Sequence, residues 1–482
     1  MYKTRLISSL KTLTHKELQR FHAFVSSPFY NKNPRVLELL DLLIPHAPQY
    51  EGKELDRENI FMKLFPKETF QEQKLRLETS ALFMLFKQFL ATLALESDPH
   101  QTQLYLLSEL RARNNPRVFE SEVKTLVKTL ESDESINAGK YFARYRLEAE
   151  KNVFFGQEFL RKYDPSLQDK VDNLDLYFLS IKLKETCEML NRQAILKPGY
   201  QIRMTQELVN LLNQDDFYVS SSPLIAIYFQ ILQMLLQPEE LSCFYNLTEL
   251  LKTHYQKFEH HESRGMFKQA QNYCIRKINR GQEEFLSDLF SLYEQQLDNQ
   301  IILTDGHISP TDFKNIVTLG LRLKKFDWVK NFLEKYGQLI YSEHQDSIYN
   351  YNYANYLVSM EKKSEAIKLL QTVKFTDPYI QISARALLLK IFYETADTNT
   401  TLYHLDAFII FLRRNKKIAT SNRQSMLNFL KITRRLILLK DKKGIISSEE
   451  FEQQAMHILD LVEQTNPTAE KKWIREKLGL IL

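Results

Sequence analysis

Hydrophobic residues recur with a helical period along nearly the whole chain. Near the start, Leu18, Phe21 and Val25 lie at positions i, i+3 and i+7, which places their side chains on one face of an α-helix. Strand-like alternation is rare, and the one hairpin signal is the Asp-Gly pair within residues 304–307. The pattern predicts an all-α protein built as an array of helical hairpins with an N-terminal helical bundle.

The spacing of the helical segments and of the breaks between them predicts three regions. Residues 1–95 contain four apolar helical segments, enough for a compact bundle. Residues 96–300 contain long helices with short polar breaks, a spacing typical of antiparallel helix pairs. Residues 301–482 contain a repeat, followed by a basic segment, 413–443, and C-terminal capping helices.

Helix-start signals recur in the C-terminal third of the chain. Each combines an acid or serine, which caps the first turn, with a proline or serine that follows it. The starts are Ser309-Pro310, Asp346-Ser347 and Asp377-Pro378, spaced by 37 and 31 residues. Periods near 34 residues indicate stacked helix hairpins.

One copy of this repeat resembles the tetratricopeptide repeat (TPR). In the stretch 351–378, Ala354, Ala366 and Pro378 follow one another at twelve-residue spacing. The two alanines match the positions where the paired TPR helices touch closely. The resemblance extends over about residues 310–414.

The preceding copy departs from the family pattern. Leu319-Gly320 is similar to a family pair, but Val329 follows after only nine residues and replaces the expected alanine. In TPR proteins the first helix of each hairpin lines a concave surface that binds a protein or peptide. The resemblance therefore implies a non-catalytic scaffold or adaptor with a protein or peptide partner. The candidate groove residues are Tyr351, Asn355, Ser359, Arg322 and Lys325.

The N-terminal pattern carries a second resemblance. The pattern consists of Ile7, Leu10, Leu13, Thr14, Glu17, Leu18, Phe21 and Phe24. This pattern resembles the first helices of death-fold modules such as pyrin domains. It also resembles, over more residues, the opening of a bacterial family of large helical proteins with no assigned function, where a segment like SPFYNKN (27–33) follows. The second resemblance implies a fold and no activity.

The loop SSPFYNKNPR (26–35) joins the first two strong helices. We expect Asn33 to cap the second of them and Pro34 to take its first position. Phe29 is expected to plug the end of the bundle, which leaves Tyr30 and Lys32 as candidate contacts.

Motifs for enzyme chemistry are missing from the sequence. It contains no GxSxG, GxxxxGK[ST], GxGxxG or DxDxDG pattern, and only 11 glycines are available for phosphate-cradling loops. In the His-rich stretch 253–265, His254 and His261 are seven residues apart, two helical turns, and are too distant for one metal. We interpret that stretch as a polar helix end. The sequence therefore predicts a protein that is no enzyme and uses no cofactor or metal.

Cysteine usage and hydropathy predict a cytoplasmic protein without a membrane span. The three cysteines are odd in number and lack CxxC spacing, which favours buried thiols in a reduced compartment. The most apolar stretch, 223–236, is too short to cross a bilayer and contains two glutamines.

The basic segment 413–443 contains eleven Lys and Arg residues and one acid, Asp441. It carries a charge of +10, although the whole chain carries +5. One interpretation is a surface that binds nucleic acid or another polyanion. The other is a solvated helix face, balanced in part by the acidic helix predicted at 447–464. The candidate polyanion contacts are Arg413, Arg414, Lys416, Lys417, Arg423, Lys431, Arg434 and Arg435.

Overall fold

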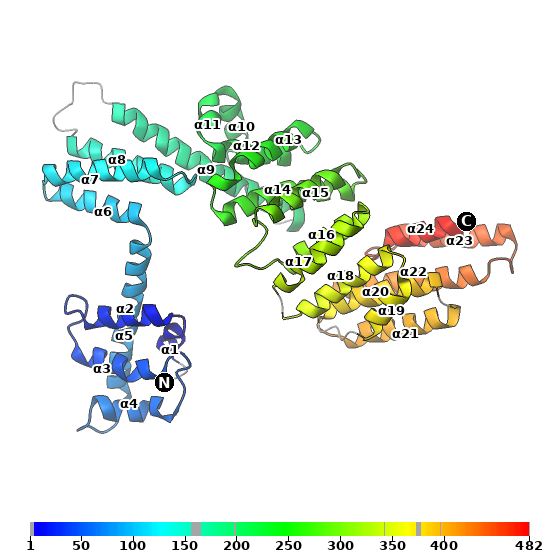
Figure 1. Ribbon diagram of the computed structural model, residues 1–482, viewed down its shortest axis with the longest axis horizontal. Coiled ribbons are helices and arrows are strands. Elements are labelled where there is room, and N and C mark those ends of the chain that lie inside the picture. Colours follow the sequence, from blue (N-terminus) through cyan, green and yellow to red (C-terminus); the bar gives the residue numbers. More distant parts are fainter. Residues whose placement is uncertain are drawn as a thin grey trace. The chain divides into compact units, whose positions relative to one another are not determined.

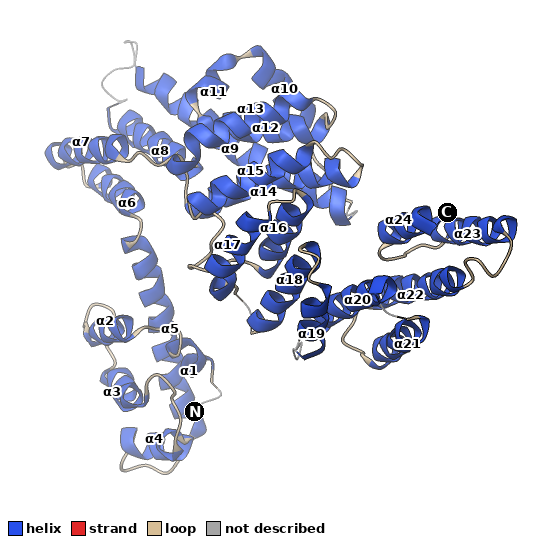
Figure 2. Cartoon of the chain, turned by 45° about the vertical axis from the view of Figure 1, so that its right-hand side comes forward, coloured by secondary structure: helices blue, strands red, loops and turns tan. Residues whose placement is uncertain are grey.

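The computed structural model describes residues 4–155, 165–196, 199–341, 343–372, 377–395 and 397–481. Within those ranges the chain forms 24 α-helices and no β-strand, and 79% of the structure is helical (Figure 2). Two isolated bridges, Thr304 to His307 and Ile308 to Ile340, are its only β-type pairings there. The prediction of an all-α protein is confirmed.

The chain divides into two compact units, residues 1–225 and residues 226–482. Helix α12 (Pro223–Leu236) contains the boundary between them. The three-region division stays a prediction.

Five helices at the N-terminus share one hydrophobic core. They are α1 (Arg5–Leu10), α2 (His15–Ser26), α3 (Pro34–Leu43), α4 (Arg57–Leu64) and α5 (Glu72–Glu96) (Figure 1). The core contains apolar residues from all five helices, because each helix presents an apolar stripe to its neighbours.

Side chains cap both α2 and α3, and the cap expected at Asn33 is confirmed. The Thr14 hydroxyl accepts a hydrogen bond from the Glu17 backbone N–H at 3.2 Å, and the Glu17 carboxylate accepts one from the Thr14 N–H at 2.8 Å. The Asn33 side chain accepts a hydrogen bond from Arg35, and Pro34 is the first residue of α3. Local sequence therefore determines where α2 and α3 begin.

The expectation that Phe29 plugs the bundle end is wrong. Its side chain is 83% exposed, and its ring meets the ring of Tyr30 edge-on, at 4.9 Å between centroids. Tyr30 instead stacks on Phe24, with centroids 3.9 Å apart. Phe24 also contacts Phe89, with centroids 5.6 Å apart, so Tyr30 rather than Phe29 packs on the core at this point.

Helix α5 is, among the described residues, the one helix long and apolar enough to cross a membrane by length and composition. Its apolar residues Leu75, Leu82, Leu85, Phe86 and Phe89 are buried in the N-terminal core.

The rest of the first unit continues as further helices. These are α6 (Pro99–Ala112), α7 (Pro116–Ser132), α8 (Ala138–Phe155), α9 (Pro165–Leu196), α10 (Thr205–Gln214) and α11 (Asp216–Ser221). Prolines at the first positions of α6 and α7 follow capping residues, Asp98 and Asn115, whose side chains accept backbone hydrogen bonds.

The second unit continues in the same manner from α12. Its next helices are α13 (Leu241–His254), α14 (His260–Asn279), α15 (Phe285–Asp298), α16 (Pro310–Arg322), α17 (Phe326–Tyr336) and α18 (Gln345–Ser359). They are followed by α19 (Lys363–Thr372), α20 (Pro378–Thr395), α21 (Thr398–Arg414), α22 (Thr420–Asp441), α23 (Ser448–Gln464) and α24 (Lys471–Ile481). Helix α18 packs against α16, α17, α19 and α20.

Two of the three predicted helix starts in this unit are confirmed. Ser309 caps α16 through its hydroxyl, and Asp377 accepts hydrogen bonds from the first turn of α20. The predicted start at Asp346-Ser347 is wrong by two residues. Helix α18 begins at Gln345 after His344, and no side chain caps it.

Small residues lie at the crossings of paired helices. Ala354 of α18 and Ala366 of α19 are fully buried in one cluster. At the α16–α17 crossing, a Cβ added to Gly320 would lie 2.5 Å from a methyl carbon of Val329. Gly320 thus accommodates a valine where the TPR pattern has alanine.

Candidate partner-binding and polyanion-binding surfaces

The predicted groove stripe lies along the part of α18 that its neighbours leave half-exposed. Tyr351, Asn355 and Ser359 are all half-buried. The Asn355 amide donates to the Tyr351 carbonyl at 2.9 Å, and the Ser359 hydroxyl donates to the Asn355 carbonyl at 3.0 Å. The donor groups of Asn355 and Ser359 bind the helix's own backbone, so the stripe presents mainly the Tyr351 ring to an approaching molecule.

Tyr351 connects the first helices of three successive hairpins. Burial raises the pKa of its phenol, while hydrogen bonds with the side chains of Asn355 and Ser383 of α20 act in the opposite direction. Lys314 of α16 lies over its ring, 5.9 Å from the centroid. The structure therefore brings α16, α18 and α20 together around this side chain.

The two cations predicted at the groove edge are engaged elsewhere. Arg322 pairs with Glu283 at 3.0 Å, and Lys325 lies over the ring of Phe290, 4.6 Å from its centroid. Neither contacts Tyr351, Asn355 or Ser359 by any interaction found among the described residues.

The start of α24 lies close to the same helices. Glu470, just before α24, pairs with Lys390 of α20 at 2.6 Å, and its charge acts on the phenol of Tyr351. Lys472 lies 3.7 Å from Glu283, and Lys477 forms an ion pair with Glu394. The C-terminal segment thus contributes charges beside the predicted groove.

The basic segment runs from the end of α21 into α22. Arg413 and Arg414 end α21, Lys416 and Lys417 follow in the connection, and all four side chains are exposed. Arg423 is half-buried and donates to the Ile418 carbonyl at 3.0 Å.

The remaining candidate contacts, on α22, differ in their exposure and in their partners. Lys431 is exposed, and Arg435 is exposed and hydrogen-bonded to His457 at 3.2 Å. Arg434 forms an ion pair with Asp406 of α21. Among the eleven bases of the segment, this is the one ion pair with a carboxylate found within the described residues.

The acidic helix expected to balance these bases is α23. Its residue Glu463 pairs instead with Arg475 of α24, at 2.6 Å. No ion pair joins α23 to the basic segment in the part of the chain that the structure describes. Nine of the eleven bases are exposed, although Lys440 and Lys443 also donate to the carbonyls of Tyr393 and Ile481, and Lys442 to the Gln454 side chain.

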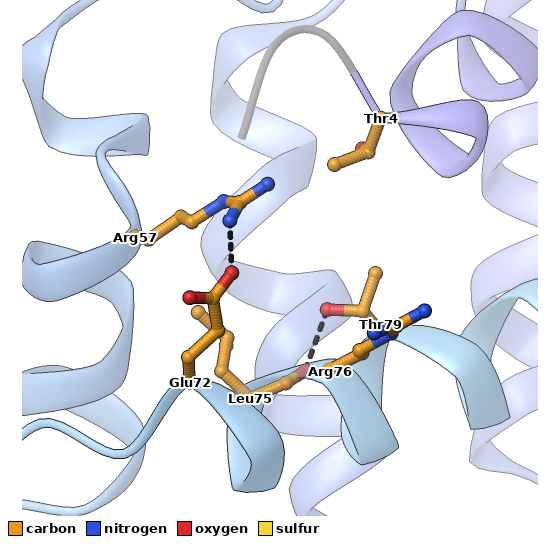
Figure 3. Close-up of a pocket in the computed structure, with 6 residues that line it drawn as sticks. All are labelled: Thr4, Arg57, Glu72, Leu75, Arg76 and Thr79. Atoms are coloured by element: carbon orange, nitrogen blue, oxygen red, sulfur yellow. Dashed lines mark hydrogen bonds and ion pairs between the residues drawn. The ribbon is translucent and has the colours of Figure 1, made fainter.

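Figure 3 shows a polar pocket of the N-terminal bundle, several of whose lining side chains already form hydrogen bonds or ion pairs. Arg57 reaches into it and forms an ion pair with Glu72, while the Thr79 hydroxyl donates to the Leu75 carbonyl at 2.7 Å. Arg57, Glu72 and Thr79 therefore already have partners within the bundle.

The three cysteines are free and buried. Burial strongly raises the pKa of the Cys187 and Cys274 thiols. A thiol with a raised pKa is a poor nucleophile at neutral pH, so these side chains have a structural role.

The structure also contains a polar cavity beside α14, lined in part by His260, His261 and Gly265. This cavity was not predicted from the sequence. Its residues fall partly in the stretch interpreted as a polar helix end, and α13 ends at His254 whereas α14 begins at His260. The usable signal was Gly265, a glycine inside a long helical pattern.

No protein-family model, curated protein or solved structure matches the chain.

Proposed function

We propose that this chain is a non-catalytic adaptor with TPR-like hairpins over residues 310–414. It holds a protein or peptide partner on the face formed by α16, α18 and α20. The observation that supports this most is the packing of α18, which contacts its own hairpin partner α19 and also the first helices of both neighbouring hairpins. That neighbour pattern is the one that gives stacked hairpins a common inner surface.

The chemistry of the face favours a partner that combines an aromatic or apolar side chain with charges of both signs. Tyr351 and Lys314 provide a ring and a cation close together. Glu283 and Glu394 provide carboxylates at the border, where Lys472 and Lys477 already approach them. Tyrosine in such a setting supplies a large contact area and loses little conformational entropy on binding.

Site-specific photo-crosslinking in cells tests this proposal. A crosslinking amino acid replaces Lys314, which is exposed on α16 and adjacent to Tyr351. We expect adducts of defined mass that become weaker when Tyr351 is also changed to Ala.

The matched control carries the same crosslinker at Lys368, an exposed lysine of α19, the second helix of the α18 hairpin. The same adducts from both positions, or none from Lys314, would contradict the adaptor proposal. Thermal melting of each variant verifies that the fold is retained.

A second candidate function is polyanion binding, including nucleic acid, through segment 413–443. It is favoured by the exposure of Arg413, Arg414, Lys416 and Lys417, for which no ion pair is found among the described residues. Cations held together without carboxylates attract phosphate backbones, and release of counterions makes such binding strongly salt-dependent.

Affinity for heparin and for single-stranded RNA, measured over a range of salt concentrations, tests this candidate. Changing the four bases to Ser is expected to reduce the slope of log K against log salt by roughly 3, since each lost phosphate contact contributes about 0.7–0.9. The control variant removes Lys11, Lys16, Lys53 and Lys67, four exposed lysines of the first unit. Equal losses in both variants, or no binding at low salt, would exclude a specific role for the segment.

A further inference from the structure

A polar cavity of about 360 Å³ lies beside one face of α14, within the second unit. The end of α15, the segment after it and the first turn of α16 complete its lining. This volume is at the small end of the range for ligand sites in proteins.

Two buried amides lie at this cavity. Gln271 of α14 and Gln296 of α15 are 1% and 2% exposed, and the Gln271 amide donates a hydrogen bond to the Gln296 oxygen. The remaining groups, Gln271 Oε1 and Gln296 Nε2, have no partner among the described residues, although both side chains line the cavity. Exchanging O and N in both amides leaves the same pair, one donor and one acceptor.

The charged groups of the lining leave an excess of positive charge. Arg264 and Lys268 follow one another by one turn on α14, and Asp312 is the one carboxylate of the lining. Asp312 accepts from Lys268 at 2.9 Å and from Ser309 at 2.7 Å, and it lies 3.9 Å from Arg264. One carboxylate against two permanent cations favours an anionic ligand.

Gly265 leaves open space at the cavity because it has no side chain. It lies within a helix of 20 residues, where glycine is less stable than alanine by about 0.5–1 kcal/mol. A Cβ at this position would meet no atom within 4 Å, so packing against neighbours does not require glycine here. Its absence of a side chain instead leaves room over the α14 backbone between Arg264 and Lys268.

We propose that this cavity binds a short peptide backbone that ends in a free carboxylate. The carboxylate lies at Arg264, the chain passes over Gly265, and a peptide group pairs its C=O and N–H with the two glutamines. Arg264 and Gln271 are two turns apart, about 10 Å along the helix, which equals about three extended residues. The assignment is independent of the adaptor face around Tyr351.

Titration of the full chain with acetyl-triglycine, followed by calorimetry, tests the proposal. We expect saturable binding with a Kd on the order of 1 mM, and at least tenfold weaker binding of the same peptide with an amidated C-terminus. A longer peptide with the same three final residues distinguishes the ligand's source. Tight binding of the longer peptide assigns a protein terminus, and preference for the short one assigns a free small peptide.

Variants complete the test. Gly265→Leu places a side chain where an added Cβ meets no atom within 4 Å and is expected to abolish binding, and Arg264→Gln is expected to weaken it at least fivefold. The control Lys257→Gln removes a nearby exposed cation outside the lining and should leave binding unchanged. Undiminished binding by Gly265→Leu, equal affinity for the amidated peptide or for inorganic phosphate, or no saturation at about 10 mM, would overturn the assignment.

Discussion

Gly320 and Val329 form a matched pair at the α16–α17 crossing. The side chain that the glycine lacks would lie 2.5 Å from the valine methyl, and Val329 is fully buried. The valine therefore depends on the glycine, and the departure from the TPR pattern at one position is compensated at the other.

Changing Gly320 to Ala is expected to lower the free energy of unfolding by about 1–3 kcal/mol, since an extra methyl group in a close-packed crossing forces a backbone shift. Adding Val329→Ala should recover part of this loss by removing the clash. Urea unfolding of the wild type, both single variants and the double variant measures the coupling. Purely additive effects would show that the two residues do not constrain each other.

Tyr273 makes stability sensitive to alkaline pH. Burial raises the pKa of its phenol to about 12, and its hydroxyl donates to the Pro238 carbonyl at 2.8 Å. The folded state holds this proton more tightly than the unfolded state, whose tyrosine has a pKa of about 10. The contribution is complete below a pH of about 10 and is lost as the pH rises toward about 12. Denaturant unfolding should show a shallower alkaline decline for Tyr273→Phe than for the wild type.

Sequence reasoning at the residue scale succeeded where a side chain acts on its own backbone. The caps at Thr14, Asn33 and Ser309 depend on atoms within three residues of each other. It was wrong for Phe29, because the exposure of a ring depends on whether distant residues have already filled the core. The cavity beside Gly265 was missed for the same reason, since its walls come from three helices.

At the scale of elements, α14 is fixed to the turn before α13 by an ion pair with one buried member. Lys277 is 2% exposed, and its ammonium lies 2.6 Å from the carboxylate of Glu239. This hydrogen bond lowers the pKa of Glu239 below its ordinary value of 4.5. The stabilisation is therefore present above pH 4.5 and is lost as the pH falls further.

Glu239→Gln is expected to lower the melting temperature at neutral pH, because a buried ammonium loses its charged partner. Thermal unfolding measures the change. The control Glu249→Gln breaks an exposed pair with Lys252 and should leave the melting temperature nearly unchanged, since exposed ion pairs contribute little. If Glu239→Gln is equally mild, the buried lysine is satisfied without that carboxylate.

Helical period predicted the existence of elements better than their limits or partners. Helix α18 begins at Gln345, before the expected acid cap, because tertiary packing holds its uncapped first turn. The acidic helix α23 was correctly expected after the basic segment. Its residue Glu463, however, forms an ion pair with Arg475 of α24 and not with a base of that segment. Pairing between helices depends on their relative rotation, which a single sequence does not specify.

At the scale of the molecule, the N-terminal bundle has a core of its own. Its buried cluster draws only on residues from Leu6 to Phe89. A fragment of residues 1–97 should therefore unfold cooperatively when heated, as monitored by far-ultraviolet circular dichroism. Phe21→Ala, at a fully buried position, should cost the fragment about 3–5 kcal/mol.

The exposed ring of Phe29 supplies the control for this fragment, since Phe29→Ala should leave its melting temperature nearly unchanged. A broad, non-cooperative melt of residues 1–97 would show that the bundle needs the following helices.

Helix α24 and Glu470, just before it, form ion pairs with residues that are synthesised well before them. Glu283, Lys390 and Glu394 emerge from the ribosome well before Glu470, Lys472 and Lys477, with which they pair. Domains begin to fold from the N-terminal side as they are made, so the hairpins form first with these charges facing solvent. The region beside α16, α18 and α20 therefore reaches its final charge only after α24 has been made, and a chain shortened before Glu470 presents these residues without their partners.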